Sequence, residues 1–128
     1  MDKAVVIIVE DDPNVASFLE TTLASEYETK LVTNGALALQ LLDHVTPDLL
    51  VLDIRLPGAS GVDICRRIRS DQRLRDAKLL VVTGYPDSPE TKEIHQIGVD
   101  ALLEKPITPH RLRRAVRQLL EGENGKSR

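Results

Sequence analysis

Charged and hydroxyl side chains that could take part in chemistry follow short apolar runs of the sequence. Glu10 and Asp11 follow one run, Asp53 follows a second, Thr83 ends a third, and Lys105 follows a fourth. Three carboxylates held close together repel one another unless a cation or a proton intervenes. A hard divalent cation such as Mg²⁺ prefers oxygen ligands and commonly binds carboxylates together with waters and phosphate oxygens. If these side chains converge, they predict a site for Mg²⁺ and a phosphoryl group.

The individual side chains suit phosphoryl transfer to Asp53. With a metal ion beside it, the Asp53 carboxylate can act as a nucleophile and form an acyl phosphate. Lys105 would neutralise phosphoryl oxygens as a point charge, and Thr83 would donate a hydrogen bond. Two other acids are given structural roles. Asp12 is predicted to cap a helix because a proline follows it, and Asp48 is predicted to be a turn residue before a strand.

Five apolar runs predict the strands that position these side chains. The run at residues 49–52 is too short for a helix and lies between two proline-containing segments, so it is predicted to be a strand buried on both faces. Similar runs predict strands at residues 4–9, 78–83 and 100–103, and a weaker pattern predicts one at 27–32. Helices are predicted to begin after the favoured N-cap residues Asp12, Asn34, Ser60, Ser88 and Thr108.

The alternation of strands and helices predicts an α/β fold. Such units form right-handed βαβ crossovers, which place a parallel sheet between two layers of helices. We therefore expect a doubly wound (βα)5 three-layer sandwich formed by residues 1–121, with a flexible C-terminal tail at 122–128. The sequence alone leaves the strand order open. A central first strand would give a five-stranded parallel sheet of the flavodoxin-like order 2-1-3-4-5.

The composition limits the classes of function. The net charge of −3 argues against direct nucleic-acid binding, and the arginines of the third and last predicted helices are expected to be solvated. The single cysteine, Cys65, cannot form an internal disulfide and is predicted to be a core residue. No apolar segment approaches the roughly 20 residues of a membrane span, and no signal peptide is recognisable. A cytoplasmic location without membrane contact is therefore expected.

The order and spacing of the motifs resemble the response regulator receiver domain of two-component signalling. The matching motifs are Glu10-Asp11 after the first strand, Asp53 followed by Pro57 and Gly61, Thr83-Gly84, and Lys105-Pro106. The resemblance extends over about residues 3–121. Each motif alone is weak, but their combination in this order is highly specific.

The resemblance implies a role for each acidic position. Asp53 would accept a phosphoryl group from a histidine kinase or a histidine phosphotransfer protein. Asp11 and Asp53 would bind Mg²⁺ directly, Glu10 would act mainly through water, and the main-chain carbonyl of Arg55 would complete the protein ligands. Such a domain is a signalling switch and not an enzyme in the usual sense, although it assists its own phosphorylation and dephosphorylation.

The resemblance also implies how the signal spreads. Phosphorylation adds a charge of about −1.5 to −2 at neutral pH, so Thr83 would move toward the phosphoryl group and Lys105 would pair with it. The Lys105–Pro106 peptide bond would be cis. The face formed by the fourth helix, the fifth strand and the fifth helix would change, and that face is a candidate surface for a homodimer.

One position departs from the pattern of the family. Many receiver domains carry an aromatic residue three positions before the lysine, and this sequence has Leu102 there. A leucine has no polar tip, so it cannot report burial through its rotamer as a tyrosine does. We hypothesise that Tyr85 and the side chain of Arg55 flank the phosphoryl group and screen it from attacking water.

Two alternative functions would keep part of this pattern. A phosphate-independent interaction module would retain the fold without using the site, although here the acidic, hydroxyl and lysine groups are all present. A phosphohydrolase with an aspartyl nucleophile usually carries a second acid two residues later, where this sequence has Arg55. A nucleotide binder is disfavoured because no Gly-rich loop follows the first predicted strand.

Overall fold

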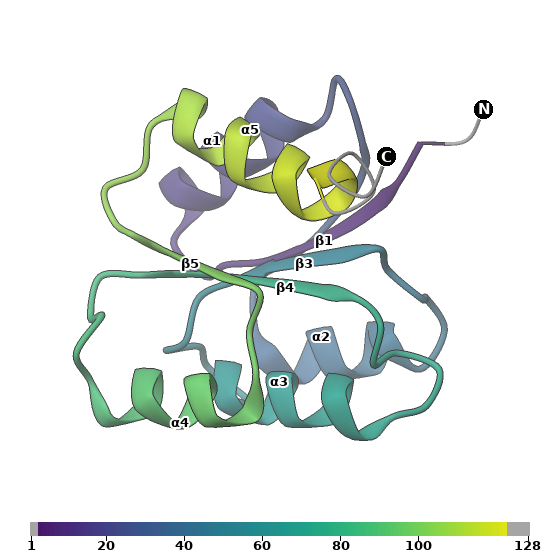
Figure 1. Cartoon of the computed structure of the whole chain (residues 1–128), viewed down its shortest axis with the longest axis vertical. Helices are drawn as coiled ribbons and strands as arrows, with labels where there is room; N and C mark the ends of the chain where they lie inside the picture. The colour runs from purple at the N-terminus through teal and green to yellow at the C-terminus, as the bar shows by residue number, and fades with distance from the viewer. Residues whose placement is uncertain (1–2, 123–128) are drawn as a thin grey trace.

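The chain forms a five-stranded parallel sheet between two layers of helices. A computed structural model describes residues 3–122. The sheet has the order β2-β1-β3-β4-β5, which confirms the doubly wound α/β prediction (Figure 1). The strands are β1 (Val5–Val9), β2 (Glu28–Val32), β3 (Leu49–Leu52), β4 (Lys78–Thr83) and β5 (Ala101–Glu104).

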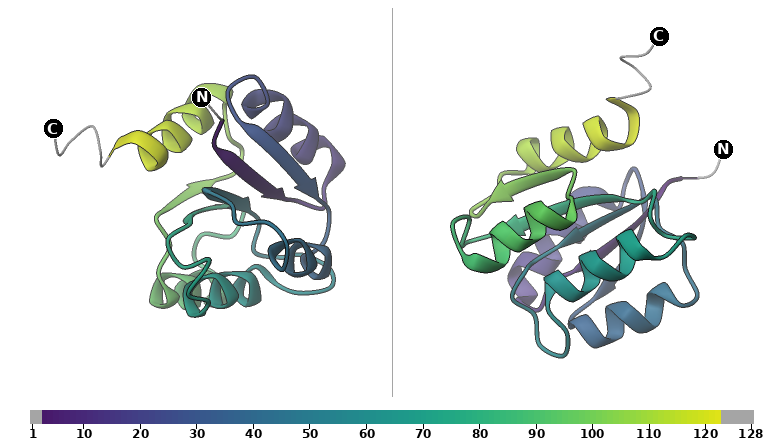
Figure 2. Two further views of the ribbon diagram at one scale, coloured as in Figure 1. Left: turned by 90° about the vertical axis from the view of Figure 1, so that its right-hand side faces the viewer. Right: turned by 60° about the horizontal axis from the view of Figure 1, so that its bottom comes forward.

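The helices divide between the two faces of the sheet. Helices α1 and α5 cover one face, and α2, α3 and α4 cover the other (Figures 1 and 2). A π-helical segment, η1 (Gln118–Gly122), continues α5. The other helices are α1 (Pro13–Leu23), α2 (Gly35–Leu42), α3 (Gly61–Ser70), α4 (Pro89–Ile97) and α5 (Pro109–Arg117).

The helix starts are set by the side chains that the sequence singles out. The Asp12 carboxylate accepts hydrogen bonds from the backbone N–H groups of Asn14 and Val15, so Asp12 caps α1 as predicted. Ser60 and Asp63 form a complete capping box at the start of α3. Each cap satisfies backbone donors that the helix itself leaves unpaired.

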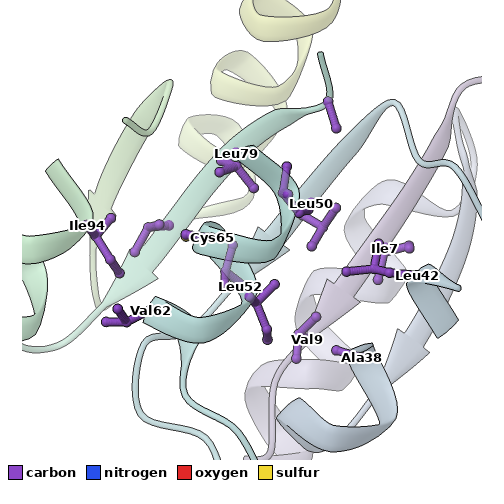
Figure 3. Packing of buried hydrophobic residues seen from close by; sticks show 14 of the residues in the cluster. Ile7, Val9, Ala38, Leu42, Leu50, Leu52, Val62, Cys65, Leu79 and Ile94 are labelled. Carbon is purple, nitrogen blue, oxygen red and sulfur yellow. The ribbon is translucent and has the colours of Figure 1, made fainter. Parts of the chain in front are cut away.

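Two aliphatic cores lie on opposite faces of the sheet. Alternate residues of the strands point to opposite faces, so Ile7 and Leu50 join the core beneath α2, α3 and α4 (Figure 3). Val6 and Val51 join the core beneath α1 and α5. Cys65 is fully buried in the first core as predicted, and burial raises the pKa of its thiol to about 12.

The structure corrects two details of the prediction. Arg69 was expected to point outward from α3 into solvent, but its guanidinium donates hydrogen bonds to three backbone carbonyls and to Asp100. The fifth strand spans Ala101–Glu104, one residue later at each end than predicted, and the side chain of Asp100 before it accepts the N–H of Leu79. Of the predicted tail at 122–128, Gly122 ends η1 and the remainder lies outside the described residues.

The helices of residues 3–122 fall short of the length and apolar character needed to cross a bilayer.

Candidate functional site

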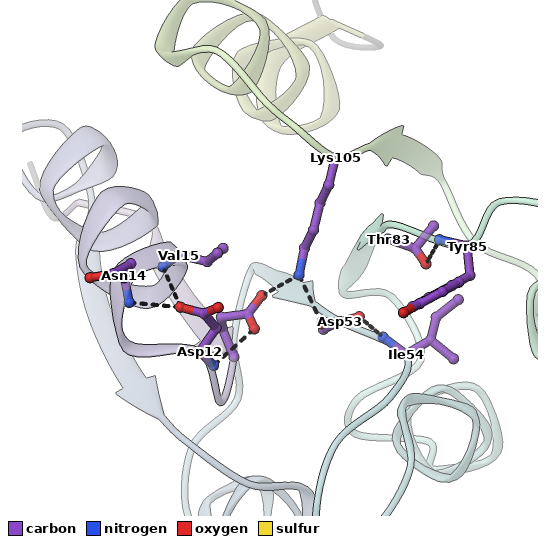
Figure 4. Close-up of polar contacts among 9 residues, drawn as sticks. Asp12, Asn14, Val15, Asp53, Ile54, Thr83, Tyr85 and Lys105 are labelled. Atoms are coloured by element: carbon purple, nitrogen blue, oxygen red, sulfur yellow. Dashed lines mark hydrogen bonds and ion pairs between the residues drawn. The ribbon is translucent and has the colours of Figure 1, made fainter.

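The polar residues singled out in the sequence meet at the carboxyl ends of the strands. Val9 and Leu52 are paired in the β1–β3 register, so Glu10 and Asp53, which follow them, leave neighbouring strands side by side. Thr83 ends β4, and Lys105 follows β5. This edge is where open parallel sheets place their ligands. Figure 4 shows Lys105 reaching across the edge toward the acidic side chains.

Three carboxylates form the centre of the site. Glu10, Asp11 and Asp53 each offer a carboxylate oxygen, and these oxygens all lie within 4.8 Å of one another. Glu10 is buried, with 1% of its side chain exposed; Asp53 is 13% exposed, and Asp11 is open to solvent. The cluster therefore combines a buried acid with two acids that a ligand can reach.

Lys105 bridges two of these acids. Its Nζ lies 2.9 Å from Asp53 Oδ2 and 3.1 Å from Glu10 Oε1. Partial burial works against the lysine charge, but the hydrogen bonds to Asp53 and Glu10 raise the pKa of Lys105 overall. Burial raises the pKa of Glu10, against the hydrogen bonds that it accepts from the Asp12 N–H and from Lys105. One lysine thus offsets part of the charge of three neighbouring carboxylates.

The loop after β3 holds Asp53 through tight backbone contacts. The Gly61 N–H donates to the Ile54 carbonyl at 2.7 Å, which pins the start of α3 against this loop. A Cβ atom on Gly61 would lie 2.6 Å from the Asp53 carbonyl oxygen, closer than real Cβ contacts allow. Glycine is therefore required at Gly61 by close approach of the backbone. On the other side of the site, the Lys105–Pro106 peptide bond is cis, the isomer that the resemblance implies.

Thr83 is buried at the end of β4, and its hydroxyl is engaged locally. Thr83 Oγ1 accepts a hydrogen bond of 2.9 Å from the N–H of Tyr85. A hydroxyl that accepts can also donate one hydrogen bond. Thr83 therefore couples the edge of the sheet to the loop that leads into α4.

Tyr85 and Arg55 lie together beside the site. The guanidinium carbon of Arg55 is 3.9 Å from the centroid of the Tyr85 ring, a cation–π contact. Tyr85 is 55% exposed, and Figure 4 shows its ring pointing from the end of β4 toward Asp53. The pair is connected through the Tyr85 N–H to Thr83, and its hypothesised flanking role stays a prediction.

Sequence reasoning missed Glu90 as a residue connected to the site. Glu90 lies in the first turn of α4, and its Oε1 is 3.8 Å from an Arg55 amino group. An acid in the first turn stabilises a helix through the macrodipole. This local role explains Glu90 in the sequence, and nothing there indicates a contact with Arg55. Only the path of the β3–α3 loop brings Arg55 to this helix.

The donor set fits a hard divalent cation. Three carboxylate oxygens in one cluster match the preference of Mg²⁺ for oxygen ligands, and the exposed side of the cluster leaves room for water and phosphate oxygens. A thiolate or imidazole, which would favour a softer transition metal, is not part of the cluster found among residues 3–122.

Comparison with known proteins assigns the fold and site to a family. The response regulator receiver domain model matches residues 6–117, which include all three acids, Thr83 and Lys105. The polar-differentiation response regulator DivK of Brucella anthropi is 32% identical over 120 residues, covering 94% of this chain and 98% of that protein. The chain therefore belongs to the response regulator receiver domain family of two-component systems, and its fold and acidic cluster are those of a phosphorylation-controlled switch.

Solved structures show the same architecture. The receiver domain of a signal transduction histidine kinase from Syntrophus aciditrophicus is 30% identical, with a TM-score of 0.84 over 93% of this chain and 91% of that chain. The receiver domain of a sensor histidine kinase from Pseudomonas aeruginosa PAO1 is 25% identical, with a TM-score of 0.84 over 92% of this chain and 98% of that chain. That structure carries a magnesium ion coordinated in its active site cleft.

Proposed function

We propose that Asp53 is the phosphoacceptor of this switch and that Lys105 and Thr83 bind the phosphoryl group. The observation that carries the proposal is the position of the Lys105 ammonium, 2.9 Å from an Asp53 oxygen and beside two further acids. A phosphoryl group on Asp53 would place its oxygens within reach of this ammonium. The receiver family supplies the expected donor, a histidine kinase or a histidine phosphotransfer protein.

The reaction makes and breaks one bond to phosphorus. An Asp53 carboxylate oxygen attacks the phosphorus, a new oxygen–phosphorus bond forms, and the bond from phosphorus to the donor breaks with its electron pair on the donor. Lys105 leaves its ion pair with Asp53 for the phosphoryl oxygens, and the Thr83 hydroxyl donates to one of them. In dephosphorylation, a water oxygen attacks the same phosphorus and forms a new bond to it, the bond to Asp53 breaks with its electron pair on the carboxylate, and inorganic phosphate leaves with the protons of the water.

Glu10, Asp11 and Asp53, with the main-chain carbonyl of Arg55, are the groups that would hold Mg²⁺. The ion would offset the charge of the phosphoryl oxygens during transfer. Lys105 neutralises only part of the acidic cluster, so the phosphoryl group would otherwise enter a site of net negative charge. This imbalance supports the assignment of a second cation to the site.

A groove beside the site suits the docking of the phosphodonor. It has a volume of about 480 Å³ and lies between the first turns of α1 and the loop after β5. Mostly apolar side chains line it, together with Asn14 and Lys105, and Lys105 contacts Asp53, so a donor that binds there comes close to Asp53. We propose that a kinase or phosphotransfer protein docks in this groove. The groove is lined by Asn14, Val15, Phe18, Lys105, Pro106 and Ile107.

We further propose that a second surface, the face formed by α4, β5 and α5, carries the output. Two copies of the chain would pair through that face, and the domain would not contact nucleic acid directly.

Mass spectrometry of the intact protein tests the assignment. Incubation with acetyl phosphate and Mg²⁺ is expected to add one phosphate, and removal of Mg²⁺ with a chelator is expected to prevent it. Asp53→Asn should abolish the adduct because the amide is a poor nucleophile, whereas the matched variant Asp48→Asn, at the opposite end of β3, should retain it. A protein that takes up no phosphate would instead be a phosphate-independent module, and turnover of unrelated phosphoesters would indicate a phosphohydrolase.

Decay of the same adduct tests the proposed screening by Tyr85 and Arg55. If the stacked pair keeps water from the phosphorus, Tyr85→Ala should shorten the lifetime of the phosphorylated protein, by about two- to tenfold for a barrier change near 1 kcal/mol. Tyr85→Phe should keep the wild-type lifetime, because it preserves the ring on which Arg55 stacks. An unchanged decay rate in Tyr85→Ala would contradict the screening role.

A further inference from the structure

The first turn of α4 is held by contacts with two separate loops. The Thr91 hydroxyl and the Ser88 N–H both donate to the Tyr85 carbonyl, at 2.8 and 3.2 Å. On the other side, Arg55 of the β3–α3 loop faces Glu90 of α4 at 3.8 Å. The helix is thus held from the loop after β4 and from the loop that carries Asp53.

The contact between Arg55 and Glu90 is loose. A separation of 3.8 Å is beyond a normal hydrogen bond, and Glu90 Oε1 is buried without a hydrogen-bond partner among the described residues. About half of each side chain remains exposed. Arg55 is at the same time stacked on Tyr85. The guanidinium is therefore positioned near the site by the ring and is only weakly retained by Glu90.

We propose that Arg55 exchanges partners when Asp53 is phosphorylated, leaving Glu90 for the phosphoryl group and so releasing the first turn of α4. This inference rests on the proposed function, because it needs a phosphoryl group at Asp53. Arg55 is a positioning residue in this scheme: before phosphorylation it holds α4, and afterwards it no longer does.

Charge and geometry favour the exchange. A phosphoryl group carries about −1.5 to −2 charges and three strong acceptor oxygens, whereas Glu90 carries one charge. Arginine binds phosphate oxygens with two parallel hydrogen bonds, which Glu90 does not receive at its present distance. Arg55 follows Asp53 by two residues on the same loop, so it can change partners without a large movement of the backbone.

The exchange provides a route to α4 that does not need an aromatic residue in β5. Leu102 is partly buried and packs against the core beneath α2, α3 and α4. Its side chain has no polar group that could reorient. The Thr83 hydroxyl and Arg55 both touch Tyr85, which in turn holds Thr91. A phosphoryl group that attracts Thr83 and Arg55 therefore acts on both connections to α4.

A double-mutant cycle in two states tests the exchange. Hydrogen–deuterium exchange of the amides in residues 88–94 would be measured for wild type, Arg55→Ala, Glu90→Gln and the double variant, each with and without acetyl phosphate and Mg²⁺. Without phosphorylation each single variant should exchange about two- to fivefold faster than wild type, and the double variant should add little, because surface ion pairs are worth this much. In the phosphorylated state the coupling between the two residues should vanish.

The control pair joins α3 to α4, and its acid lies one turn after Glu90 on α4. Arg66 of α3 and Glu93 of α4 also form an ion pair, but Arg66 is remote from Asp53 in the chain. The cycle of Arg66→Ala and Glu93→Gln should give the same coupling in both states. The inference is overturned if the Arg55–Glu90 coupling survives phosphorylation, or if it is absent before it. Intact mass of each sample shows whether the adduct formed, so failure of the proposed function is seen separately as a wild-type protein without added phosphate.

Discussion

The two ends of the sheet use the same acidic residue types in opposite ways. At the amino ends of the strands, Asp48 accepts the N–H of Val5 at 2.8 Å, and Asp100 accepts the N–H of Leu79 at 2.7 Å and an Arg69 amino group at 2.8 Å. At the carboxyl ends, Glu10, Asp11 and Asp53 crowd together around a single lysine. The first arrangement satisfies each acid, whereas the second leaves net negative charge.

This difference separates stability from function within one sheet. An acid that accepts a backbone N–H at the start of a strand completes the hydrogen bonding of the fold, and its loss leaves a donor unpaired. An acid in the carboxyl-end cluster is held against the electrostatic repulsion of its neighbours, and burial further disfavours the charged form of Glu10. Removing an acid should therefore destabilise the protein at one end and relieve it at the other.

The largest expected effect is at the amino end. Asp100→Ala should lower the free energy of unfolding by about 1–3 kcal/mol, because it leaves the N–H of buried Leu79 and the Arg69 guanidinium without their shared acceptor. Urea denaturation measures the change. Asp76 is an exposed acid in the loop before β4, and Asp76→Ala should change the free energy of unfolding by less than about 0.5 kcal/mol.

The phosphorylation assay separates this effect from function. Asp100→Ala should still add one phosphate from acetyl phosphate, because the substituted residue is at the opposite end of the sheet from Asp53. If Asp100→Ala were as stable as wild type, or if it lost the adduct while folded, the contrast between the two ends would be wrong.

Local patterns in the sequence predicted most of the fold. The run Leu49–Leu52 is the observed β3, and the caps at Asp12 and Ser60 work as expected. Each of these depends on neighbouring residues, which the sequence lists directly. The convergence of the site was also predictable, because parallel strands deliver their carboxyl ends to one edge. The strand order that makes Glu10 and Asp53 neighbours was expected only by analogy with the flavodoxin-like order 2-1-3-4-5, and the structure confirms it.

Long-range pairing of long side chains was not predictable. Arg69 was assigned to a solvated face, yet it binds carbonyls of two loops and Asp100, which lies 31 residues later. The pair of Arg55 and Glu90 likewise depends on how the β3–α3 loop approaches α4. A flexible arginine on a helix surface has several partners within reach, and only the tertiary arrangement selects among them.

The smaller expected effect is a pH dependence at the carboxyl end. Burial raises the pKa of Glu10 above its ordinary value of 4.5, so the folded state binds this proton more tightly than the unfolded state. The stability that Glu10 contributes is then complete below about pH 4.5 and is lost as the pH rises through the folded pKa. Glu10→Gln does not titrate. Without Mg²⁺, the variant should therefore gain stability relative to wild type as the pH rises from 4 to 7.

Asp71, at the end of α3, provides a control of opposite sign. The backbone N–H of Arg73 and then the side chain of Arg67 lower the pKa of Asp71, so its contribution is present above pH 3.8 and is lost in acid. Asp71→Asn should therefore lose stability relative to wild type as the pH rises from about 2 to 4, below the range in which Glu10→Gln gains it. Urea denaturation of the three proteins from about pH 2 to 7 gives both differences. If the Glu10→Gln difference moved in the same direction as that of Asp71→Asn, Glu10 would be a stabilising carboxylate, and the carboxyl end of the sheet would not differ in kind from the amino end.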